Sequence, residues 1–361
     1  ERECVSQLSA ATGGLLGRFS LTSVASLSPT EHPWVRVVIV NYNGGAFLQR
    51  CVDALAAQTF AGFEAVIVDN ASQDGSADAL TFPDRRFRLV RSATNLGFSG
   101  GSNLGASDAQ TDWLAMLNPD TIAAPDWLEQ LHPATLRNPS TCLFGSKQIM
   151  ADSPELIDGF GDVYSIFGIP WRGGYGWPVE SCPTSDCLVF APCAAAALYR
   201  RALFVRLGGF DEDFFCYLED IDFGFRAKLE GFDCIQVARA TVRHHGSALT
   251  GKRSHFTLFH SCRNRVWLLL KNVPAALLPI MIPGFILAMI WLFVRTRKMQ
   301  PWVSQWQGFW ESRNGILAIL KKRATIQRGR VLPVHRLARQ LVWNHRAVRR
   351  RDYCCRPISR M

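Results

Sequence analysis

Two groups of acidic residues in this chain have the types and spacing to do chemistry. The first contains Asp69 and Asp120, which follow the apolar runs in FEAVIVD and DWLAMLNPD. Carboxylates at these positions could hold a divalent cation that bridges two phosphates. Two plainer interpretations stay open. Asp120 could cap the segment after it, and Asp69 could bind a ribose, as an acidic residue after a strand does in NAD enzymes.

The second acidic group lies in the aromatic-rich stretch EDFFCYLEDIDFGFRAKLEGF, residues 212–232. Its apolar spacing predicts a helix, on which Asp222 and Arg226 are four residues apart and form a structural ion pair. Glu219 and Asp220 fall in the first turn, where the helix dipole stabilises carboxylates. They could serve the helix alone, or they could supply a general base held against an aromatic wall.

A single base suits one kind of sugar chemistry. A hydrolase of glycosidic bonds generally needs two carboxylates, because its leaving group must be protonated. A transferase that uses a nucleotide-sugar has a diphosphate leaving group, whose charge a metal ion can stabilise. It needs one carboxylate to take the proton from the acceptor hydroxyl, which contributes roughly 10²–10⁴-fold in rate.

The elements that must position these residues alternate between strands and helices. Continuous apolar runs at 35–40, 63–68 and 113–117 predict strands buried on both faces. We therefore expect an α/β fold with a mostly parallel nucleotide-binding sheet flanked by helices. Four polar residues come just past strand ends: Asn43, Asp69, Asn70 and Asp120. Ligands bind at this edge of open α/β sheets, so one crevice should contain them.

The charge of the chain is unevenly distributed. The 361 residues carry a net charge of +10, but residues 295–361 carry +15, with 17 Lys and Arg against two acidic residues. The first 294 residues therefore carry −5. Such a basic tail suits nucleic acid or an anionic membrane surface. Eleven cysteines without a CxxC pair favour reduced thiols over a zinc site.

The segment 273–294 is apolar and uncharged, and it is about long enough to cross a bilayer. Three prolines in its first half favour an interfacial hairpin or an in-plane helix pair, with the basic tail held to anionic lipid. A buried helical subdomain is an equal alternative. Residues 1–34 lack the apolar core of a secretory signal and are expected to form a leader or a disordered arm.

Six stretches occur in the order found in bacterial family 2 glycosyltransferases: VVIVNYNGG, VDNASQDGS, NLGFSGGSNLG, LNPDT, GGFDEDFFCYLEDIDFGFRAKLEGF and RHHGSALTGKRSHFTLFHSCRNRVWLLLKNVP. The chain is most similar to the rhamnosyltransferase-like branch, which builds O-antigen and related polysaccharides. The resemblance covers about residues 35–294. It implies a GT-A fold, an inverting mechanism and a nucleoside diphosphate sugar bound with Mg²⁺ or Mn²⁺.

The resemblance also implies roles for individual residues. The positions matched to nucleotide or donor binding are Asn41, Tyr42, Asn43, Asp69, Gly97, Gly100, Gly101 and Asn103. Asp120 matches the last Asp of the metal motif, and Asn118 stands where many relatives have Asp. His244 matches a His near the diphosphate or metal, with His245 as a competing assignment. Asp220 matches the catalytic base, and Glu219 is its supporting neighbour.

We thus expect a leader at 1–34, a GT-A domain at 35–260 and a helical, basic, membrane-associated region at 261–361. The expected activity is inverting transfer of a sugar, best L-rhamnose from dTDP-L-rhamnose, to a lipid-linked or polysaccharide acceptor. It would take place at the inner face of the bacterial cytoplasmic membrane, without nucleic acid. No Gln-x-x-Arg-Trp motif occurs, which favours single-sugar addition over processive synthesis.

Two other functions are alternatives to glycosyl transfer. A dinucleotide-dependent oxidoreductase should have GxGxxG in its first turn, whereas this chain has Asn-Tyr-Asn-Gly-Gly-Ala. A non-catalytic, membrane-attached module that binds a glycan or nucleotide in the same cleft is the remaining alternative. The acidic residues at 120, 219 and 220 argue against it.

Overall fold

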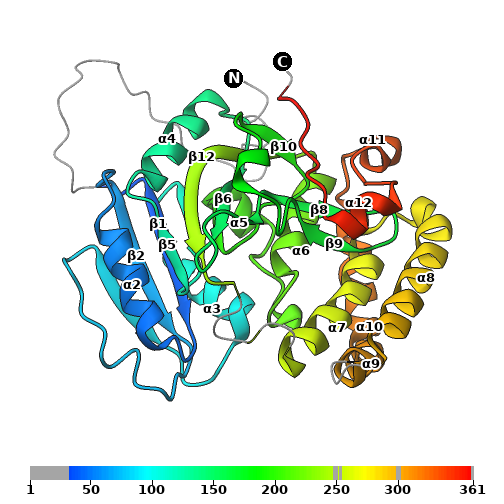
Figure 1. Ribbon diagram of the computed structural model, residues 1–361, viewed down its shortest axis with the longest axis horizontal. Helices are drawn as coiled ribbons and strands as arrows, with labels where there is room; N and C mark the ends of the chain where they lie inside the picture. Colours follow the sequence, from blue (N-terminus) through cyan, green and yellow to red (C-terminus); the bar gives the residue numbers. More distant parts are fainter. Residues whose placement is uncertain (1–31, 247–250, 252–253, 298–301, 359–361) are drawn as a thin grey trace, which may run out of the picture.

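The computed structural model describes residues 32–246, 251, 254–297 and 302–358. The expected leader therefore lies almost entirely outside the described residues. A large mixed sheet forms the centre of the molecule, with helices on both faces and a helical group at one side (Figure 1).

The sheet contains ten strands within the described part of the chain. Its strand order is β10-β12-β6-β11-β4-β1-β2-β3, with β5 paired to β12 and β7 to β6. The strands are β1 (Val35–Asn41), β2 (Phe63–Asp69), β3 (Phe87–Arg91), β4 (Trp113–Leu117), β5 (Thr121–Ala123), β6 (Leu143–Met150), β7 (Ile157–Gly159), β10 (Cys187–Val189), β11 (Ala196–Arg200) and β12 (Cys234–His244). The strands β4, β1, β2 and β3 are parallel, and the apolar runs of β1, β2 and β4 are the ones that the sequence predicted. The α/β fold with a mostly parallel nucleotide-binding half is confirmed.

The second half of the sheet is mixed. Strand β11 is antiparallel to both β4 and β6 and joins the two halves, while β12 is parallel to β6. A separate hairpin of β8 (Asp162–Tyr164) and β9 (Pro170–Arg172) stands beside the sheet. These short strands deliver residues to the site described below.

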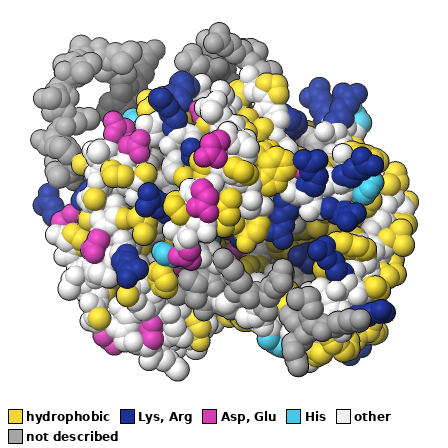
Figure 2. Space-filling view, in the orientation of Figure 1, with side chains coloured by type: hydrophobic (Ala, Val, Ile, Leu, Met, Phe, Trp, Pro, Cys, Tyr) yellow, Lys and Arg dark blue, Asp and Glu magenta, His cyan; other side chains and the backbone are white. Residues whose placement is uncertain are grey.

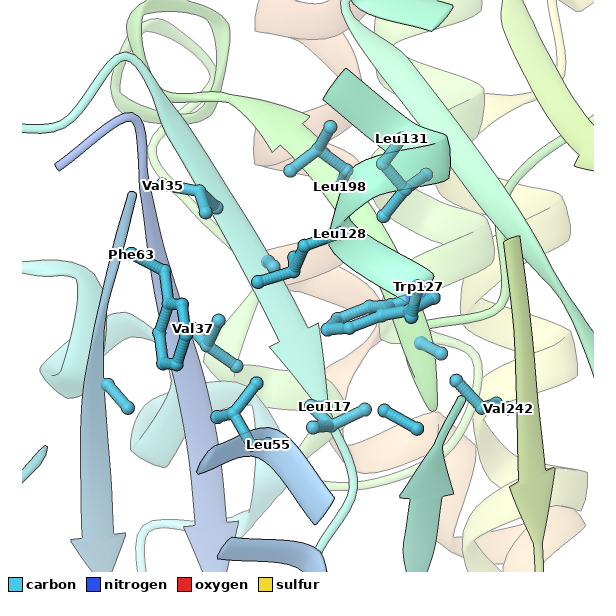
Figure 3. Packing of buried hydrophobic residues seen from close by; sticks show 14 of the residues in the cluster. Val35, Val37, Leu55, Phe63, Leu117, Trp127, Leu128, Leu131, Leu198 and Val242 are labelled. Atoms are coloured by element: carbon cyan, nitrogen blue, oxygen red, sulfur yellow. The ribbon is translucent and has the colours of Figure 1, made fainter. Parts of the chain in front are cut away.

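Alternate residues of β1 enter two different cores. Val35 and Val37 pack with α2 (Gly45–Ala56) and α4 (Trp127–Arg137) on one face, as Figure 3 shows for Leu55, Trp127 and Leu128. Val38 and Val40 face the other side, toward α3, α5 and α6. These helices are α3 (Gly97–Ala106), α5 (Arg201–Arg206) and α6 (Glu219–Leu229). A strand buried on both faces explains why its sequence is continuously apolar.

A third apolar cluster joins the C-terminal helices to α6. These helices are α7 (His255–Asn272), α8 (Leu278–Thr296), α9 (Trp302–Glu311), α10 (Ile316–Arg328), α11 (Val334–Ala338) and α12 (His345–Arg350). Four short 3₁₀ turns complete the helical elements: η1 (Val179–Ser181), η2 (Glu212–Phe214), η3 (Ala275–Leu277) and η4 (Ser312–Gly315). Phe225 of α6 packs in one core with Leu268 of α7 and Phe285 of α8. The boundary expected between residues 260 and 261 falls inside α7, so this helix is shared by both parts.

A buried charge network also fixes α7 on α6. The ion pair predicted between Asp222 and Arg226 is present, with the guanidinium Nε 2.8 Å from the carboxylate Oδ2. The Lys271 ammonium lies 2.8 Å from the same oxygen, and the Asn272 amide donates to the other at 2.8 Å. Lys271 also pairs with Asp211, which precedes α6.

The apolar segment 273–294 does not form the expected hairpin. The short turn η3 leads directly into one continuous helix, α8. Pro274 precedes the helix and Pro279 lies in its first turn, where backbone N–H groups have no intrahelical partner to lose. Pro283 is accommodated inside the helix. Pro274 and Pro279 therefore mark a helix start, and Pro283 does not break the helix.

The basic tail folds back onto the body of the molecule. Leu188 of β10 and Arg356 exchange two backbone hydrogen bonds of 2.8 and 3.0 Å. The Trp171 indole donates to the carbonyl of Asp352 at 3.1 Å, and the Gly174 amide donates to Arg351 at 2.7 Å. In the view of Figure 2, acidic side chains gather on the left half and Lys and Arg on the right.

Candidate active site

A cavity of about 750 Å³ opens at the carboxyl ends of the parallel strands. One wall comes from loops that follow β1, β2, β3 and β4, with Tyr42, Asn70, Asn95, Gly97, Asn118 and Asp120. The opposite wall comes from β8, β9, α6, α7 and the end of β12, with Asp162, Arg172, Glu219, Asp220, His244 and Arg265. Of the four strand-end residues that the sequence predicted in one crevice, Asn70 and Asp120 line this cavity, whereas Asn43 and Asp69 do not.

The loops after β1 and β2 are tied together by side chains. The buried Asn41 amide donates to Ser72 and Ser76 at 3.0 Å and to Asp69 at 3.3 Å. Asn43 has a positive φ of 54°, and its side chain accepts from the Gln73 amide at 2.8 Å. Tyr42 lines the cavity. Three residues near it, Asn41, Asn43 and Asp69, hold the two loops together and do not line the cavity.

Asn70 is the strand-end residue of β2 that reaches the cavity. Its amide donates to Asn95 at 2.9 Å and to the carbonyl of Gly97 at 3.0 Å. Gly97 has a φ of +69°, and a Cβ there would come within 2.3 Å of the Phe215 carbonyl. Only glycine permits this close approach between α3 and the loop before α6.

Three residues expected beside the nucleotide lie outside the cavity lining. A Cβ at Gly100 would meet Leu96, and a Cβ at Gly101 would meet Val40 at 2.6 Å. Both glycines therefore allow tight packing of α3 on its surroundings. The Asn103 amide donates to the Phe210 carbonyl at 2.9 Å. These placements give no support to a nucleotide contact by Gly100, Gly101 or Asn103.

Asp120 and His244, the two residues expected at a metal ion, lie together. The His244 Nε2 atom is 3.3 Å from Asp120 Oδ1, and its Nδ1 is 2.7 Å from Asp158 Oδ2. Burial alone would lower the pKa of His244, but Asp120 and Asp158 outweigh it and raise the pKa to about 9. The competing His245 pairs with the exposed Asp152 and does not line the cavity.

This arrangement fits a divalent cation. The hydrogen bond between Nδ1 and Asp158 turns Nε2 toward Asp120, which is how histidine ligands of metals are commonly oriented, and a cation bound there would displace the Nε2 proton. One carboxylate and one imidazole nitrogen suit Mn²⁺ better than Mg²⁺, which prefers oxygen ligands throughout. The Asn118 side chain adjoins the same position, with its Nδ2 atom 3.4 Å from His244 Nε2.

Asp220 occupies the start of α6 in the same cavity. Its Oδ2 accepts from the Ala194 amide at 2.9 Å and its Oδ1 from the Ile221 amide at 2.8 Å. Burial raises the pKa of Asp220 despite these bonds. The pKa of Glu219 is raised well above its ordinary value, first by burial and then by the charge of Asp220. The Oε2 atom of Glu219 is buried without a hydrogen-bond partner. Glu219 is therefore the member of the pair that keeps its proton.

The loop before α6 is held in an unusual conformation. Phe215, Tyr217 and Leu218 all have positive φ angles, of 62°, 71° and 69°. Such conformations are costly for residues other than glycine and persist where neighbours enforce them, often at functional sites. The buried Asn264 of α7 enforces this one, because its amide donates to the carbonyls of Phe214, Cys216 and Tyr217 at 2.7–2.9 Å.

The aromatic wall predicted around the base is smaller than the sequence suggests. Phe214, Phe223 and Phe225 are buried in the core, while Phe215 and Tyr217 line the cavity. Phe223 and Phe225 enter two different cores from α6, and Phe214 ends the turn η2, while Phe215 and Tyr217 belong to the irregular loop before α6.

Four residues in or beside the cavity are among those that carry no prediction from the sequence. Asp162, Arg172 and Cys193 line the cavity, and Asp158 lies next to it, paired with Arg172 and His244. Ligand atoms of Asp162, Cys193 and Asp220 lie within 4.8 Å of one another, and Arg172 pairs with Asp158. A chain of charges thus runs between Asp220 and the Asp120–His244 pair. The signal was the pair of acids around GFG in IDGFGDVY, but the strands that hold them are only three residues long.

Comparison with solved structures identifies the fold. The chain is similar to the crystal structure of GalNAc-T7 with UDP, GalNAc and Mn²⁺, with a TM-score of 0.53, 16% identity and coverage of 84% of this chain and 59% of that one. It is also similar to residues 1–349 of S. aureus TarS in complex with UDP, with a TM-score of 0.50, 13% identity and coverage of 81% and 90%. The fold is that of a nucleotide-sugar-dependent glycosyltransferase, GT-A.

Sequence comparison gives the family. The model of glycosyl transferase family 2 matches residues 36–153. The N-acetylglucosaminyl-diphospho-decaprenol L-rhamnosyltransferase of Mycobacterium tuberculosis is 30% identical over 254 residues, which cover 62% of this chain and 80% of that protein. The chain belongs to glycosyl transferase family 2, as its motifs predicted, and it is an enzyme.

Proposed function

We propose that this enzyme transfers a sugar with inversion from a nucleoside diphosphate donor to a lipid-linked acceptor. The donor that fits best is dTDP-L-rhamnose, because the relative at 30% identity is named as an L-rhamnosyltransferase. One observation carries the proposal: Asp220 and the Asp120–His244 pair line the same cavity. A base and a diphosphate site are thereby available to one donor sugar.

In this mechanism Asp220 takes the proton of the acceptor hydroxyl while that oxygen attacks the anomeric carbon. Each Asp220 oxygen already accepts one backbone N–H, which orients the carboxylate and leaves a second lone pair for the proton. Glu219, kept neutral by burial and by Asp220, adds no second negative charge beside the incoming hydroxyl. The raised pKa of Asp220 makes it a stronger base than an exposed aspartate.

The diphosphate would leave at the Asp120–His244 pair. Asp120 and His244 would hold a divalent cation, and that ion would neutralise the charge that develops on the leaving diphosphate. Asp158 orients the His244 ring and Arg172 balances the charge of Asp158. Tyr42, Asn70 and Asn95 form the wall available to the nucleotide.

A donor screen tests the substrate assignment. Nucleotide-sugars should be added one at a time, with and without Mn²⁺, while thermal unfolding is followed. A ligand that binds only the folded state raises its stability by mass action. We expect dTDP-L-rhamnose to raise the unfolding temperature most, and only with the metal. A larger effect from another nucleotide-sugar would replace this donor.

We further propose that α8 and α9 lie on the membrane surface beside the acceptor. Helix α8 is long and apolar enough to cross a bilayer, but Met281, Phe285 and Met289 pack along the protein core, which favours an orientation in the membrane plane. Exposed apolar residues cover its outer side: Ile280, Ile286, Leu287, Ile290, Trp291 and Val294. Figure 2 shows apolar side chains along the right edge of the molecule, where Figure 1 places α8.

Helix α9 extends this apolar surface. Trp302, Trp306 and Trp310 recur every four residues and are exposed, and Trp306 packs against Phe293 of α8 at 5.4 Å between ring centroids. Tryptophan is favoured at the membrane interface, and a cation near it adds attraction to anionic lipid. We expect the protein to float with anionic liposomes; an unchanged, fully soluble protein would exclude this surface as a membrane site.

A further inference from the structure

Helix α7 turns one polar face toward the cavity. Thr257, Ser261 and Arg265 all line it. They are spaced four residues apart and therefore stack along one side of the helix, over about 12 Å. The Thr257 hydroxyl is hydrogen-bonded to the Tyr217 hydroxyl at 3.1 Å, so the first residue of this face contacts the loop before α6. Arg265 forms its other end.

Arg265 is a cation with no anionic partner among the described residues. Its Nε atom is buried without a hydrogen bond, and burial is the main influence on its charge, lowering its pKa. Arg263, two residues earlier, behaves differently. Its guanidinium donates to the carbonyls of Asp213 and Phe214 at 3.0 and 2.9 Å and covers the ring of Trp267 at 4.3 Å.

The other two arginines that line the cavity also have partners. Arg172 pairs with Asp158, and Arg351 lies over the ring of Tyr175 at 4.5 Å. A partly buried guanidinium that lacks an acidic partner is costly, and binding of an anion reduces this cost. Its planar fork matches two phosphate oxygens at once.

We propose that Arg265 binds the diphosphate of a lipid-linked acceptor. The inference rests on the proposed function, which already gives the donor diphosphate a place at Asp120 and His244. An acceptor diphosphate lies between the acceptor sugar and the lipid chain. Helix α7 runs from the cavity wall to the start of the apolar segment that contains α8, so it connects the two ends of such a molecule. Ser261, one turn before Arg265, can donate to the same phosphate.

The test uses farnesyl diphosphate as a water-soluble probe, with farnesol as the uncharged control. Binding to the full chain is measured by calorimetry, without turnover. We expect Arg265→Gln to weaken farnesyl diphosphate binding by about 10- to 100-fold, because a hydrogen bond between charged groups is lost. Binding of dTDP with Mn²⁺ should remain within about two-fold of the wild type. Arg239→Gln, which removes an exposed arginine from β12, should change neither.

Unchanged farnesyl diphosphate affinity in Arg265→Gln would overturn the proposal, and so would a loss that falls on dTDP instead. If the glutamine variant does not fold, Arg265→Lys keeps the charge and loses the fork, and it should still bind the probe more weakly than the wild type. Because these are binding measurements, a protein that binds the probe through Arg265 but transfers no sugar would refute the proposed function alone. A protein that transfers sugar with an Arg265-independent acceptor affinity would refute this inference alone.

Discussion

At the scale of single residues, the site works through groups that orient other groups. His244 faces Asp120 only because Asp158 holds its other ring nitrogen, and Asp158 is itself paired with Arg172. The neighbouring pair of His245 and Asp152 has the same chemistry outside the cavity. The type of a residue alone therefore does not define the site. Its position at the edge of the sheet does.

Asp158→Asn should weaken Mn²⁺ binding about 10- to 100-fold, because an amide orients the imidazole and supports its basicity less well than a carboxylate. Mn²⁺ affinity can be measured by electron paramagnetic resonance of the free ion. Asp152→Asn is the matched control and should leave the affinity unchanged. Equal effects of the two substitutions would show that Asp158 acts through general charge and not through His244.

Asp220→Asn should bind donor as the wild type does and lose about 10²–10⁴-fold in kcat, because no general base remains. In the wild type, kcat should rise with pH as Asp220 ionises. Its raised pKa moves that rise to higher pH than for an exposed aspartate. Full turnover by the asparagine variant, with tight donor binding retained, would remove Asp220 from this role.

At the scale of elements, α7 positions α6. Asn264 holds three carbonyls of the strained loop that precedes Asp220, and Lys271 and Asn272 hold Asp222. Helix α7 begins in the cavity wall and ends in the buried charge network. A shift of α7 would therefore move Asp220 directly. These contacts join α7 to the part of the chain that carries the base.

Asp211 gives this network a defined acid sensitivity. Burial would raise its pKa, but Lys271 and Lys322 outweigh burial and lower the pKa to about 2. A carboxyl with a lowered pKa contributes stability above its unfolded value of about 4, and this stability is lost as pH falls through about 2. The contribution corresponds to about 2 kcal/mol.

Asp211→Asn should therefore reduce the free energy of unfolding at pH 7, by at least this amount, and the difference from the wild type should shrink between about pH 5 and pH 2. Urea unfolding at several pH values measures it. Asp213→Asn is the control, since Asp213 pairs with Lys322 at 2.6 Å while half exposed, and such pairs contribute about 0–1 kcal/mol. A difference that does not depend on pH would contradict the assignment to the Asp211 carboxylate.

The sequence predicted the elements that have a strong local pattern. Strands buried on both faces are continuous apolar runs, and the pair of Asp222 and Arg226 is one helical turn apart, so both could be read directly. The remainder depends on contacts between distant residues. Lys271 is 49 residues from Asp222, and the three-residue strands β7 and β8 that carry Asp158 and Asp162 are too short to show a period. Proline at a helix start resembles proline at a break, which misled the prediction for α8.

At the scale of the whole molecule, charge is unevenly spread over the face seen in Figure 2, where Lys and Arg are most numerous on the side of the C-terminal helices proposed to face lipid. The tail does not extend freely from the body, since residues 342–356 bond back to β8, β9 and β10. Its positive charge is therefore displayed on a fixed surface next to α8. A fixed apolar and basic surface would orient the cavity with respect to the bilayer.

Leu287→Glu should reduce flotation with anionic liposomes at least several-fold, because it places a charge in the centre of the apolar face of α8. The matched control is Leu136→Glu on α4. Leu136 is 67% exposed and Leu287 is 68% exposed, so both substitutions add the same charge at positions of equal exposure. Transfer to a short, soluble acceptor should be unaffected in both variants, whereas transfer to a long-chain lipid acceptor in liposomes should fall only with Leu287→Glu. If both variants float like the wild type, α8 does not lie against lipid.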